Sequence, residues 1–298
     1  MTGAVAAIDL GGTSMKGAVA SEPGVLQHAE IRPTDRDEGP EAVIERLAGF
    51  AADLAAAGSA AAVGVAVPGL VDEQEGVARA SVNLGWHDVP LRDLLAERLG
   101  LPVAVAHDVR AAARAEGELG AARGCEDWLL VTLGTGVGAA VVMGGKPYGG
   151  AHGTGGELGH LVVDPDGPEC ACGARGCVES LASAGAVERR YAAGSADEVD
   201  AREVVERAAR GDEAAARVWR EAVDALAAGL AAYVILMDPE RIVVGGGLSD
   251  AGGALFGPLA GALAGRLTFE DAPPVVAAAL GADAGCHGAA LVAWEAAA

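Results

Sequence analysis

At 298 residues the chain is long enough for about two domains, which excludes a peptide or a fibre. It carries 21 Lys and Arg against 42 Asp and Glu, and the net charge of −21 argues against nucleic acid or an anionic membrane as a partner. Aromatic residues make up only 3% of the chain, so we expect a core of small aliphatic side chains in a layered α/β fold.

The predicted strands and helices alternate along the chain, which is typical of an α/β fold. Gly58, Gly100 and Gly211 are predicted to end helices, because glycine readily takes the left-handed conformation found there. Strands are expected at residues 4–10, 17–20, 62–67, 103–106, 128–133, 137–143, 242–245 and 274–277, and helices at 41–57, 91–99, 109–119, 201–209 and 213–237.

The start of the chain does not resemble a secretion signal. It has no basic segment, and Asp9 interrupts its apolar stretch, so a cytoplasmic location is expected. The apolar run at residues 225–237 is shorter than the roughly 20 residues needed to cross a bilayer, and we interpret it as a buried helix.

A glycine-rich turn follows the first predicted strand. Backbone N–H groups at such a turn can approach a phosphate closely, because glycine has no Cβ to collide with it. A carboxylate oxygen at the strand end suits hydrated Mg²⁺. An ordinary hairpin turn explains the same residues equally well. The residues concerned are Asp9, Gly11, Gly12, Thr13 and Lys16.

Two further glycine turns follow predicted strands. The second contains Gly134, Thr135 and Gly136, and the third contains Gly245, Gly246 and Gly247. Each can accept a nucleotide's phosphates or its flat base, and each is also compatible with a tight connection between elements. The strand–turn–strand pattern occurs at both the first and second turns. It favours a duplicated unit in the two halves of the chain, with the turns facing each other across a cleft.

Three cysteines lie close together, at Cys170, Cys172 and Cys177, ten residues and more after His160. Three thiolates and an imidazole suit tetrahedral Zn²⁺, and four protein ligands leave no position for catalytic water, so we expect a structural zinc ion. Cys125 and Cys286 stand apart and are expected to be core residues. Zinc binding would draw together the segments that carry two carboxylates, Glu157 and Glu179, which can accept hydrogen bonds from a polyol or sugar.

Asp108 follows a predicted strand and begins a predicted helix. From the residues alone, the simpler interpretation is a helix N-cap. The helix dipole would also favour its ionised form, which suits a base that accepts a hydroxyl proton during phosphoryl transfer.

Taken together, these motifs resemble the ROK family of bacterial sugar kinases and repressors. The resemblance covers nearly the whole chain and implies an α/β, two-domain actin-like ATPase (ribonuclease H-like) fold with an interdomain cleft. It also implies a first domain at residues 1–108, a larger domain at 109–285, a C-terminal helix near 286–298 packed back on the first domain, and a homodimer. The matching motifs are residues 9–13, 67–72, 83–86, Asp108, 134–138, 156–160, the cysteine loop through Glu179, and 238–239 with 245–247.

The resemblance also implies a role for individual residues. Asp108 would be the catalytic base toward a sugar hydroxyl, usually the 6-hydroxyl, and His160 would bind sugar through one ring nitrogen and zinc through the other. The remaining sugar ligands would be Gly69, Asn83, His107, Glu157 and Glu179. The ATP phosphates would lie among Gly11, Gly12, Thr13, Lys16, Gly134, Thr135 and Gly136, with Mg²⁺ near Asp9 and the adenosine against Gly246 and Gly247.

His107 departs from the family, whose kinases usually have Asn immediately before the catalytic Asp. Imidazole is bulkier than a carboxamide and has different hydrogen-bonding groups, so glucose specificity does not transfer. A different hexose, an N-acetylhexosamine and a weakened activity remain open, as does polyphosphate as the donor. A DNA-binding regulator is disfavoured by charge and by the eight residues before Asp9, whereas a non-catalytic sugar sensor remains an alternative.

Overall fold

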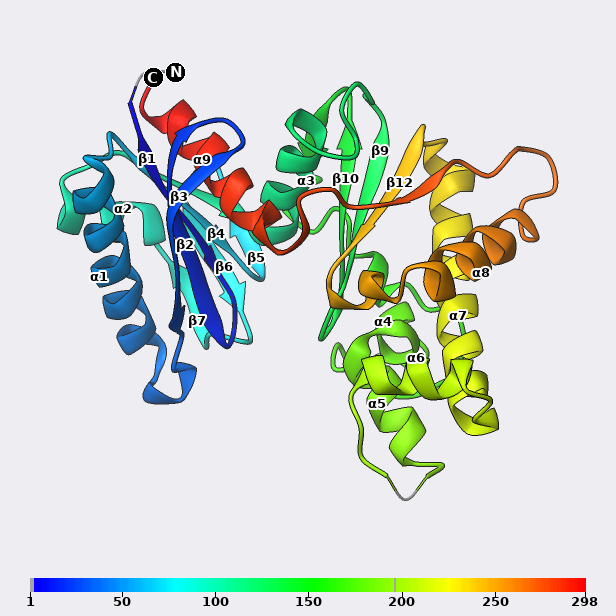
Figure 1. Ribbon diagram of the computed structural model, residues 1–298. Coiled ribbons are helices and arrows are strands. Elements are labelled where there is room, and N and C mark those ends of the chain that lie inside the picture. The colour runs from blue at the N-terminus through cyan, green and yellow to red at the C-terminus, as the bar shows by residue number, and fades with distance from the viewer. Residues whose placement is uncertain (1–2, 196) are drawn as a thin grey trace. The chain divides into compact units, whose positions relative to one another are not determined.

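The computed structural model describes residues 3–195 and 197–298, and the chain divides into two compact units. Unit 1 consists of residues 1–123, 149–154 and 282–298, and unit 2 of residues 124–148 and 155–281. Each unit has its own sheet, visible in Figure 1. The sequence-based boundary between residues 108 and 109 differs from this division, because the helix that begins at Asp108 packs within unit 1.

The main sheet of unit 1 has the strand order β3-β2-β1-β4-β8. β1 pairs antiparallel with β2 and parallel with β4, so the chain turns back sharply after β1 and crosses over before β4. A smaller sheet contains β5, β6 and β7. The strands are β1 (Val5–Leu10), β2 (Ser14–Glu22), β3 (Val25–Pro33), β4 (Val63–Val67), β5 (Leu70–Asp72), β6 (Val77–Ser81), β7 (Trp86–Val89) and β8 (Val103–His107).

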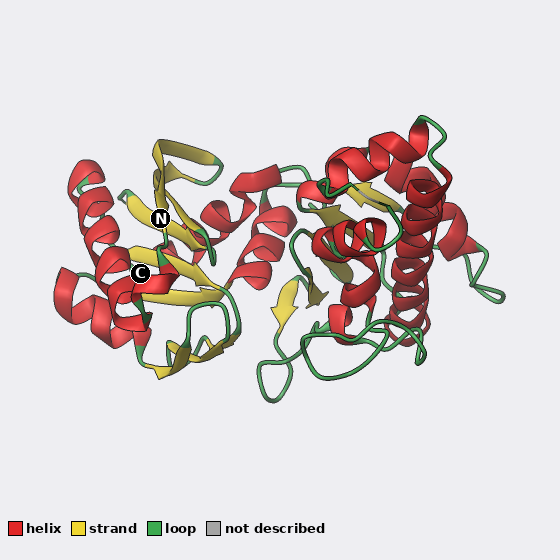
Figure 2. Ribbon diagram, turned by 90° about the horizontal axis from the view of Figure 1, so that it is seen from below, coloured by secondary structure: helices red, strands yellow, loops and turns green. Residues whose placement is uncertain are grey.

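Helices cover the main sheet of unit 1 on both faces, as Figure 2 shows. α1 (Pro40–Gly58) and α2 (Leu91–Leu99) pack together with the apolar side chains of β1, β4 and β8. α9 (Ala284–Ala296) packs on β1, β4 and β8 and against α3 (Asp108–Glu118). The C-terminal helix therefore belongs to the N-terminal unit, where the Trp294 indole N–H donates to the Gly3 carbonyl at 3.0 Å.

Glycines allow α9 to approach its neighbours closely. A Cβ on Gly64 in β4 would overlap the backbone carbonyl of Ala289, and one on Gly288 would overlap the carbonyl of Ala111 in α3. Backbone atoms, unlike the end of a long side chain, cannot move aside cheaply. This packing therefore requires glycine at both positions.

Unit 2 has a five-stranded sheet in the order β11-β10-β9-β12-β13. One face packs against α7, whose buried residues form the centre of the unit with those of β9, β10 and β12. The strands are β9 (Trp128–Leu133), β10 (Val137–Met143), β11 (Lys146–Tyr148), β12 (Arg241–Gly245) and β13 (Val275–Ala277). The helices are α4 (Val178–Ala182), α5 (Ala184–Ala192), α6 (Ala201–Ala209), α7 (Glu213–Met237) and α8 (Gly253–Ala264).

Short 3-10 helices complete the two units, at η1 (Arg36–Glu38), η2 (Leu158–His160), η3 (Gly247–Ala251) and η4 (Gly281–Asp283). Within the described residues, no helix combines the length and apolar character that crossing a membrane requires.

The predicted alternation of strands and helices is confirmed, with ends shifted by a few residues. One predicted helix end is wrong: α1 includes Gly58, and the left-handed residue that ends it is Ser59, with φ of 48°. Gly58 is needed for packing, because a Cβ there would overlap Val19. β3, β11, the strands of the smaller sheet and the short helices α4 and α5 were not predicted, since segments of three to nine residues carry little periodicity.

We expect Gly288→Ala to lower the free energy of unfolding by about 1–3 kcal/mol, because the added methyl group meets the backbone of α3. Gly49→Ala, in the middle of α1 with nothing within 4 Å of the new Cβ, is the matched control and should stabilise unit 1 by about 0.4–1 kcal/mol. Urea unfolding of the two variants measures both effects. Equal stabilities for the two variants would contradict the close packing of α9 on α3.

Candidate active site

The first glycine turn joins β1 to β2 in unit 1. The Gly11 N–H donates to the Ser14 carbonyl at 2.9 Å, which closes the turn tightly. Asp9 and Lys16 are directly opposite each other in the antiparallel register. Burial raises the pKa of the Asp9 carboxyl, and the nearby Lys16 ammonium only partly offsets this effect. A cation bound beside Asp9 would stabilise its ionised form, which is consistent with the predicted Mg²⁺ site.

Lys16 is already engaged in the structure. Its ammonium group donates to the Ala282 carbonyl at 3.0 Å, just before α9. The first turn of α9 also lies close to the Asp9 carboxylate, since a Cβ on Gly285 would overlap that group. The structure therefore fixes Lys16 to the start of α9, and its contact with phosphate remains a prediction.

Asn83 lies beside the first glycine turn. A Cβ on Gly12 would be 3.5 Å from the Cβ of Asn83, so the structure brings these two predicted ligands together. Gly69 lies in the turn between β4 and β5 with φ of +105°, and a Cβ there would overlap the Ala80 carbonyl. Glycine at this position is thus required by backbone contact, whatever its role toward a substrate.

Asp108 is the first residue of α3, directly after β8. The N-cap interpretation is wrong for Asp108, because the cap is His107: its Nδ1 accepts the Arg110 N–H at 3.4 Å. The Asp108 Oδ1 atom accepts the N–H of Val109 at 2.7 Å, and His107 Nε2 lies 3.4 Å from the same oxygen. The helix N-terminus favours the ionised carboxylate here.

Two charged residues that we did not identify from the sequence hold this junction. The Glu73 Oε1 atom accepts the backbone N–H of His107 at 2.9 Å and the Arg110 Nε–H at 2.8 Å. Arg110 is almost fully buried and also donates to the carbonyls of Gly153 and Val71. Glu73 follows β5, far from α3 in the sequence, and no local pattern signals this pairing.

In unit 2, Glu179 lies at the second glycine turn. It is in the first turn of α4, and its Oε2 atom accepts the Val137 N–H at 2.9 Å. A Cβ on Gly136 would be 2.5 Å from the same oxygen. The turn itself is closed by the Gly134 N–H, which donates to the Gly136 carbonyl at 3.0 Å. The carboxylate predicted to bind sugar is therefore packed on the turn predicted to bind phosphate.

The third glycine turn lies next to the second. Gly246 has φ of +85°, and a Cβ there would overlap the Leu133 carbonyl, immediately before Gly134. No atom lies within 4 Å of a Cβ built on Gly247. The predicted adenosine and phosphate turns of unit 2 are thus neighbours.

The segment that carries Glu157 and His160 packs on β10 through glycines. A Cβ on Gly156 would be 2.6 Å from the Ala139 carbonyl, and one on Gly159 would overlap the Val137 carbonyl. Glu157 precedes η2 and His160 ends it, so the two side chains are one turn apart. The His160 Nε2 atom is 3.9 Å from Glu157 Oε2, and both side chains are partly exposed.

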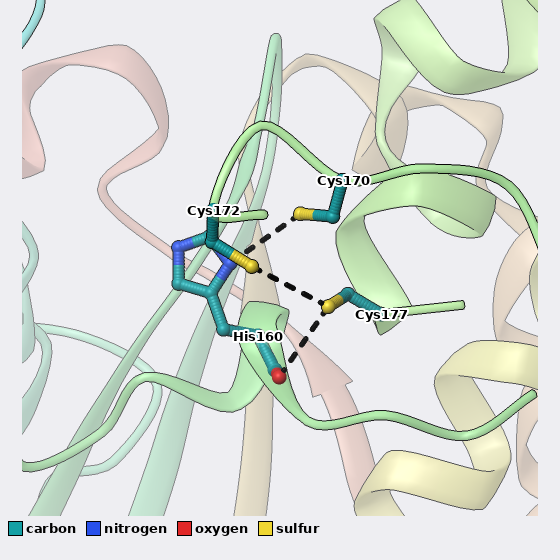
Figure 3. Close-up of side chains that lie close together, drawn as sticks. All are labelled: His160, Cys170, Cys172 and Cys177. Atoms are coloured by element: carbon teal, nitrogen blue, oxygen red, sulfur yellow. Dashed lines mark hydrogen bonds between the residues drawn. The ribbon is translucent and has the colours of Figure 1, made fainter. Parts of the chain in front are cut away.

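Figure 3 shows the four predicted metal ligands together: His160, Cys170, Cys172 and Cys177. Their candidate ligand atoms all lie within 4.8 Å of one another. The Cys170 sulfur is 3.7 Å from His160 Nδ1, and the Cys172 and Cys177 sulfurs are 3.7 Å apart. Tetrahedral Zn²⁺ with bonds of about 2.3 Å to sulfur requires sulfur–sulfur distances of about 3.8 Å, so the donor set and its spacing fit zinc.

The cysteine loop closes through glycine. Gly173 and Gly176 both have positive φ, and a Cβ on Gly176 would overlap the Asp164 carbonyl. Because Nδ1 of His160 faces the sulfurs, its Nε2 remains directed away from them. The other two cysteines lie elsewhere in the chain: Cys286 is buried and Cys125 partly buried.

The predicted site residues thus form two groups. Unit 1 contains the first glycine turn with Asn83, and the junction of β8 and α3 with His107 and Asp108. Unit 2 contains the other two glycine turns, Glu157, Glu179 and the cysteine cluster. Each group joins segments that are distant in the sequence.

Comparison with known proteins finds relatives that match nearly the whole chain. The ROK family model matches residues 5–296. A glucokinase from Thermotoga maritima is 39% identical over 97% of this chain and 96% of its own length. An N-acetylmannosamine kinase from Escherichia fergusonii is 35% identical over 84% of each chain.

Solved structures agree with the sequence relatives. The ROK hexokinase from Thermus thermophilus superimposes with a TM-score of 0.87 at 40% identity, covering 98% of both chains. A ROK family glucokinase from Streptomyces griseus in complex with glucose and AMPPNP gives a TM-score of 0.86 at 33% identity, covering 98% of this chain and 100% of that one. The fold is therefore the expected two-domain actin-like ATPase fold, and the chain belongs to the ROK family.

Proposed function

We propose that this chain is a sugar kinase that transfers the terminal phosphoryl group of ATP to a hexose or N-acetylhexosamine, at the 6-hydroxyl, with Asp108 as the general base. The observation that carries the proposal is the position of Asp108 at the first residue of α3. A helix N-terminus favours an ionised carboxylate, and such a group can accept the proton that leaves the attacking hydroxyl. The glucokinases among the relatives support the reaction class.

The glycine turns are proposed to bind ATP. Backbone N–H groups of Gly11, Gly12 and Thr13 in unit 1, with Lys16, would contact phosphate oxygens, as would Gly134, Thr135 and Gly136 in unit 2. Gly246 and Gly247 would lie against the adenosine. Asp9 would hold hydrated Mg²⁺, which neutralises phosphate charge when bound. Desolvation raises the pKa of the partly buried Asp9 carboxyl, and a cation bound beside it would offset that effect.

The sugar's remaining hydroxyls are assigned to Glu157, His160 and Glu179, with Gly69 and Asn83 also proposed to contact the sugar. The His160 imidazole would bind structural zinc through Nδ1, which faces Cys170, and a sugar hydroxyl through Nε2. The metal would then fix the orientation of a substrate-binding ring. The homodimer and the cytoplasmic location expected from the sequence remain predictions.

Asp108→Asn should lower kcat by roughly 10²–10⁴-fold, because the amide cannot accept the hydroxyl proton. Sugar- and ATP-dependent release of ADP, measured with glucose, mannose, N-acetylglucosamine and N-acetylmannosamine, tests the reaction and identifies the sugar. Asp93→Asn is the matched control, since Asp93 also lies in the first turn of a helix but is exposed on α2. Its kcat should equal that of the wild type.

No turnover by the wild-type protein with any of these sugars at millimolar concentration would refute the kinase. Sugar binding without phosphoryl transfer would instead support the alternative of a non-catalytic sensor. Polyphosphate in place of ATP in the same assay tests the donor.

The purified protein should contain close to one zinc ion per chain. Cys172→Ala should lower the zinc content and the temperature of unfolding, because the metal closes the loop of residues 160–177. Cys125→Ala, which lies outside the cluster, should retain both. Metal analysis and thermal unfolding of all three proteins check this. A wild type that contains no zinc and unfolds at the same temperature as Cys172→Ala would contradict the site.

A further inference from the structure

The two ring nitrogens of His107 have different neighbours. Nδ1 accepts the backbone N–H of Arg110 and so caps α3, while Nε2 lies 3.4 Å from Asp108 Oδ1. A neutral imidazole has one acceptor and one donor nitrogen. Because Nδ1 accepts, the ring proton must be on Nε2, the nitrogen that lies 3.4 Å from the Asp108 carboxylate.

The environment keeps His107 neutral. Burial, and the positive charge of Arg110, lower the pKa of His107 to about 3, and 12% of the side chain is exposed. A neutral ring with the proton on Nε2 therefore persists throughout the ordinary pH range.

Glu73 holds the backbone of His107 in place by accepting its N–H. In the common capping box, a Glu or Gln at the third helical position reaches back to the N–H of the cap residue. The third position of α3 is Arg110, and Glu73 replaces the missing carboxylate: one of its oxygens accepts both the His107 N–H and the Arg110 Nε–H. Arg110 also donates to Val71 and Gly153, so the cap is anchored to β5 and to residues 149–154.

We propose that His107, supported by Glu73 and Arg110, is a positioning residue whose Nε2–H orients the Asp108 carboxylate, rather than a residue that reads sugar hydroxyls. This inference rests on the proposed role of Asp108 as the base. Hydrogen bonds of this kind are often long in the free enzyme and shorten in the substrate complex, and 3.4 Å is compatible with that behaviour.

The proposal has a consequence for substrate recognition. The helix cap uses the acceptor nitrogen of His107, and the proposal assigns its single N–H to Asp108, so the ring has no group left for a sugar hydroxyl. An Asn whose oxygen makes the cap keeps two N–H donors on its amide nitrogen, so one of them could contact the sugar. On this proposal, sugar selectivity arises from the other ligands.

Two substitutions separate the contacts of His107. The Asn Oδ1 atom stands as many bonds from Cα as Nδ1, so His107→Asn retains the cap and loses the group at Nε2. The Gln Nε2 atom stands as many bonds away as the imidazole Nε2, so His107→Gln retains a donor near Asp108 and loses the cap. His87, on β7 with a side chain 86% exposed, provides the matched controls His87→Asn and His87→Gln.

We expect His107→Asn to lower kcat on the order of 10- to 100-fold, the effect of losing a hydrogen bond to a charged group, with the KM for sugar changed less than threefold. His107→Gln should lose less kcat than His107→Asn but unfold at a lower temperature, because its helix cap is gone. Both His87 variants should match the wild type. A raised sugar KM with unchanged kcat in His107→Asn would show that His107 reads sugar and would overturn the proposal.

A measurement that needs no activity completes the test. The ring nitrogens of ¹⁵N-labelled His107 should show a protonated Nε2 and an unprotonated Nδ1 in long-range nitrogen–proton NMR spectra. Spectra of His107→Asn assign the signals by their disappearance. A proton on Nδ1 would refute the proposed orientation even if the enzyme turns over. A wild type with the expected tautomer but no activity would instead refute the proposed function and leave the geometry intact.

Discussion

Direct contact between backbones, permitted by glycine, determines how both units are built. In unit 1, Gly64 and Gly288 allow α9 to touch β4 and α3. In unit 2, Gly156 and Gly159 place the segment before the cysteine loop on β10, and Gly246 places the third turn against Leu133. A methyl group at any of these positions would separate the segments that carry the candidate site. The chain has 45 glycines and 3% aromatic residues. Its segments are thus positioned by close backbone contacts rather than by large side chains.

Close contact with the backbone also positions the carboxylates of the candidate site. Asp108 and Glu179 both accept backbone N–H groups, and Asp9 lies against the first turn of α9. Carboxylates in such settings are held by fixed dipoles that need no rearrangement when a substrate arrives. Phosphoryl transfer depends on positioning and on charge stabilisation, so pre-placed carboxylates and glycine turns suit the proposed reaction.

The junction of β8 and α3 is held by a histidine where the family resemblance leads one to expect an asparagine. A helix cap needs one acceptor, and the imidazole Nδ1 of His107 supplies it as an Asn oxygen would. The larger ring brings a second nitrogen close to Asp108. Glu73, after β5, accepts from the backbone N–H of His107 and from Arg110 of α3, and Arg110 also donates to the Gly153 carbonyl. His107 thus both caps the helix and lies beside the carboxylate of Asp108.

Local sequence determined the main strands and helices, the glycine turns and the spacing of the cysteines, because periodicity and backbone freedom act over a few residues. The ordered motifs were also enough to identify the ROK family. Only the tertiary structure decided that His107 caps α3 in place of Asp108, that Glu73 and Arg110 support it, and that α3 joins unit 1. The cap itself joins residues only three apart, but its support by Glu73 joins residues 34 apart, and no local pattern encodes which distant group will satisfy a buried donor.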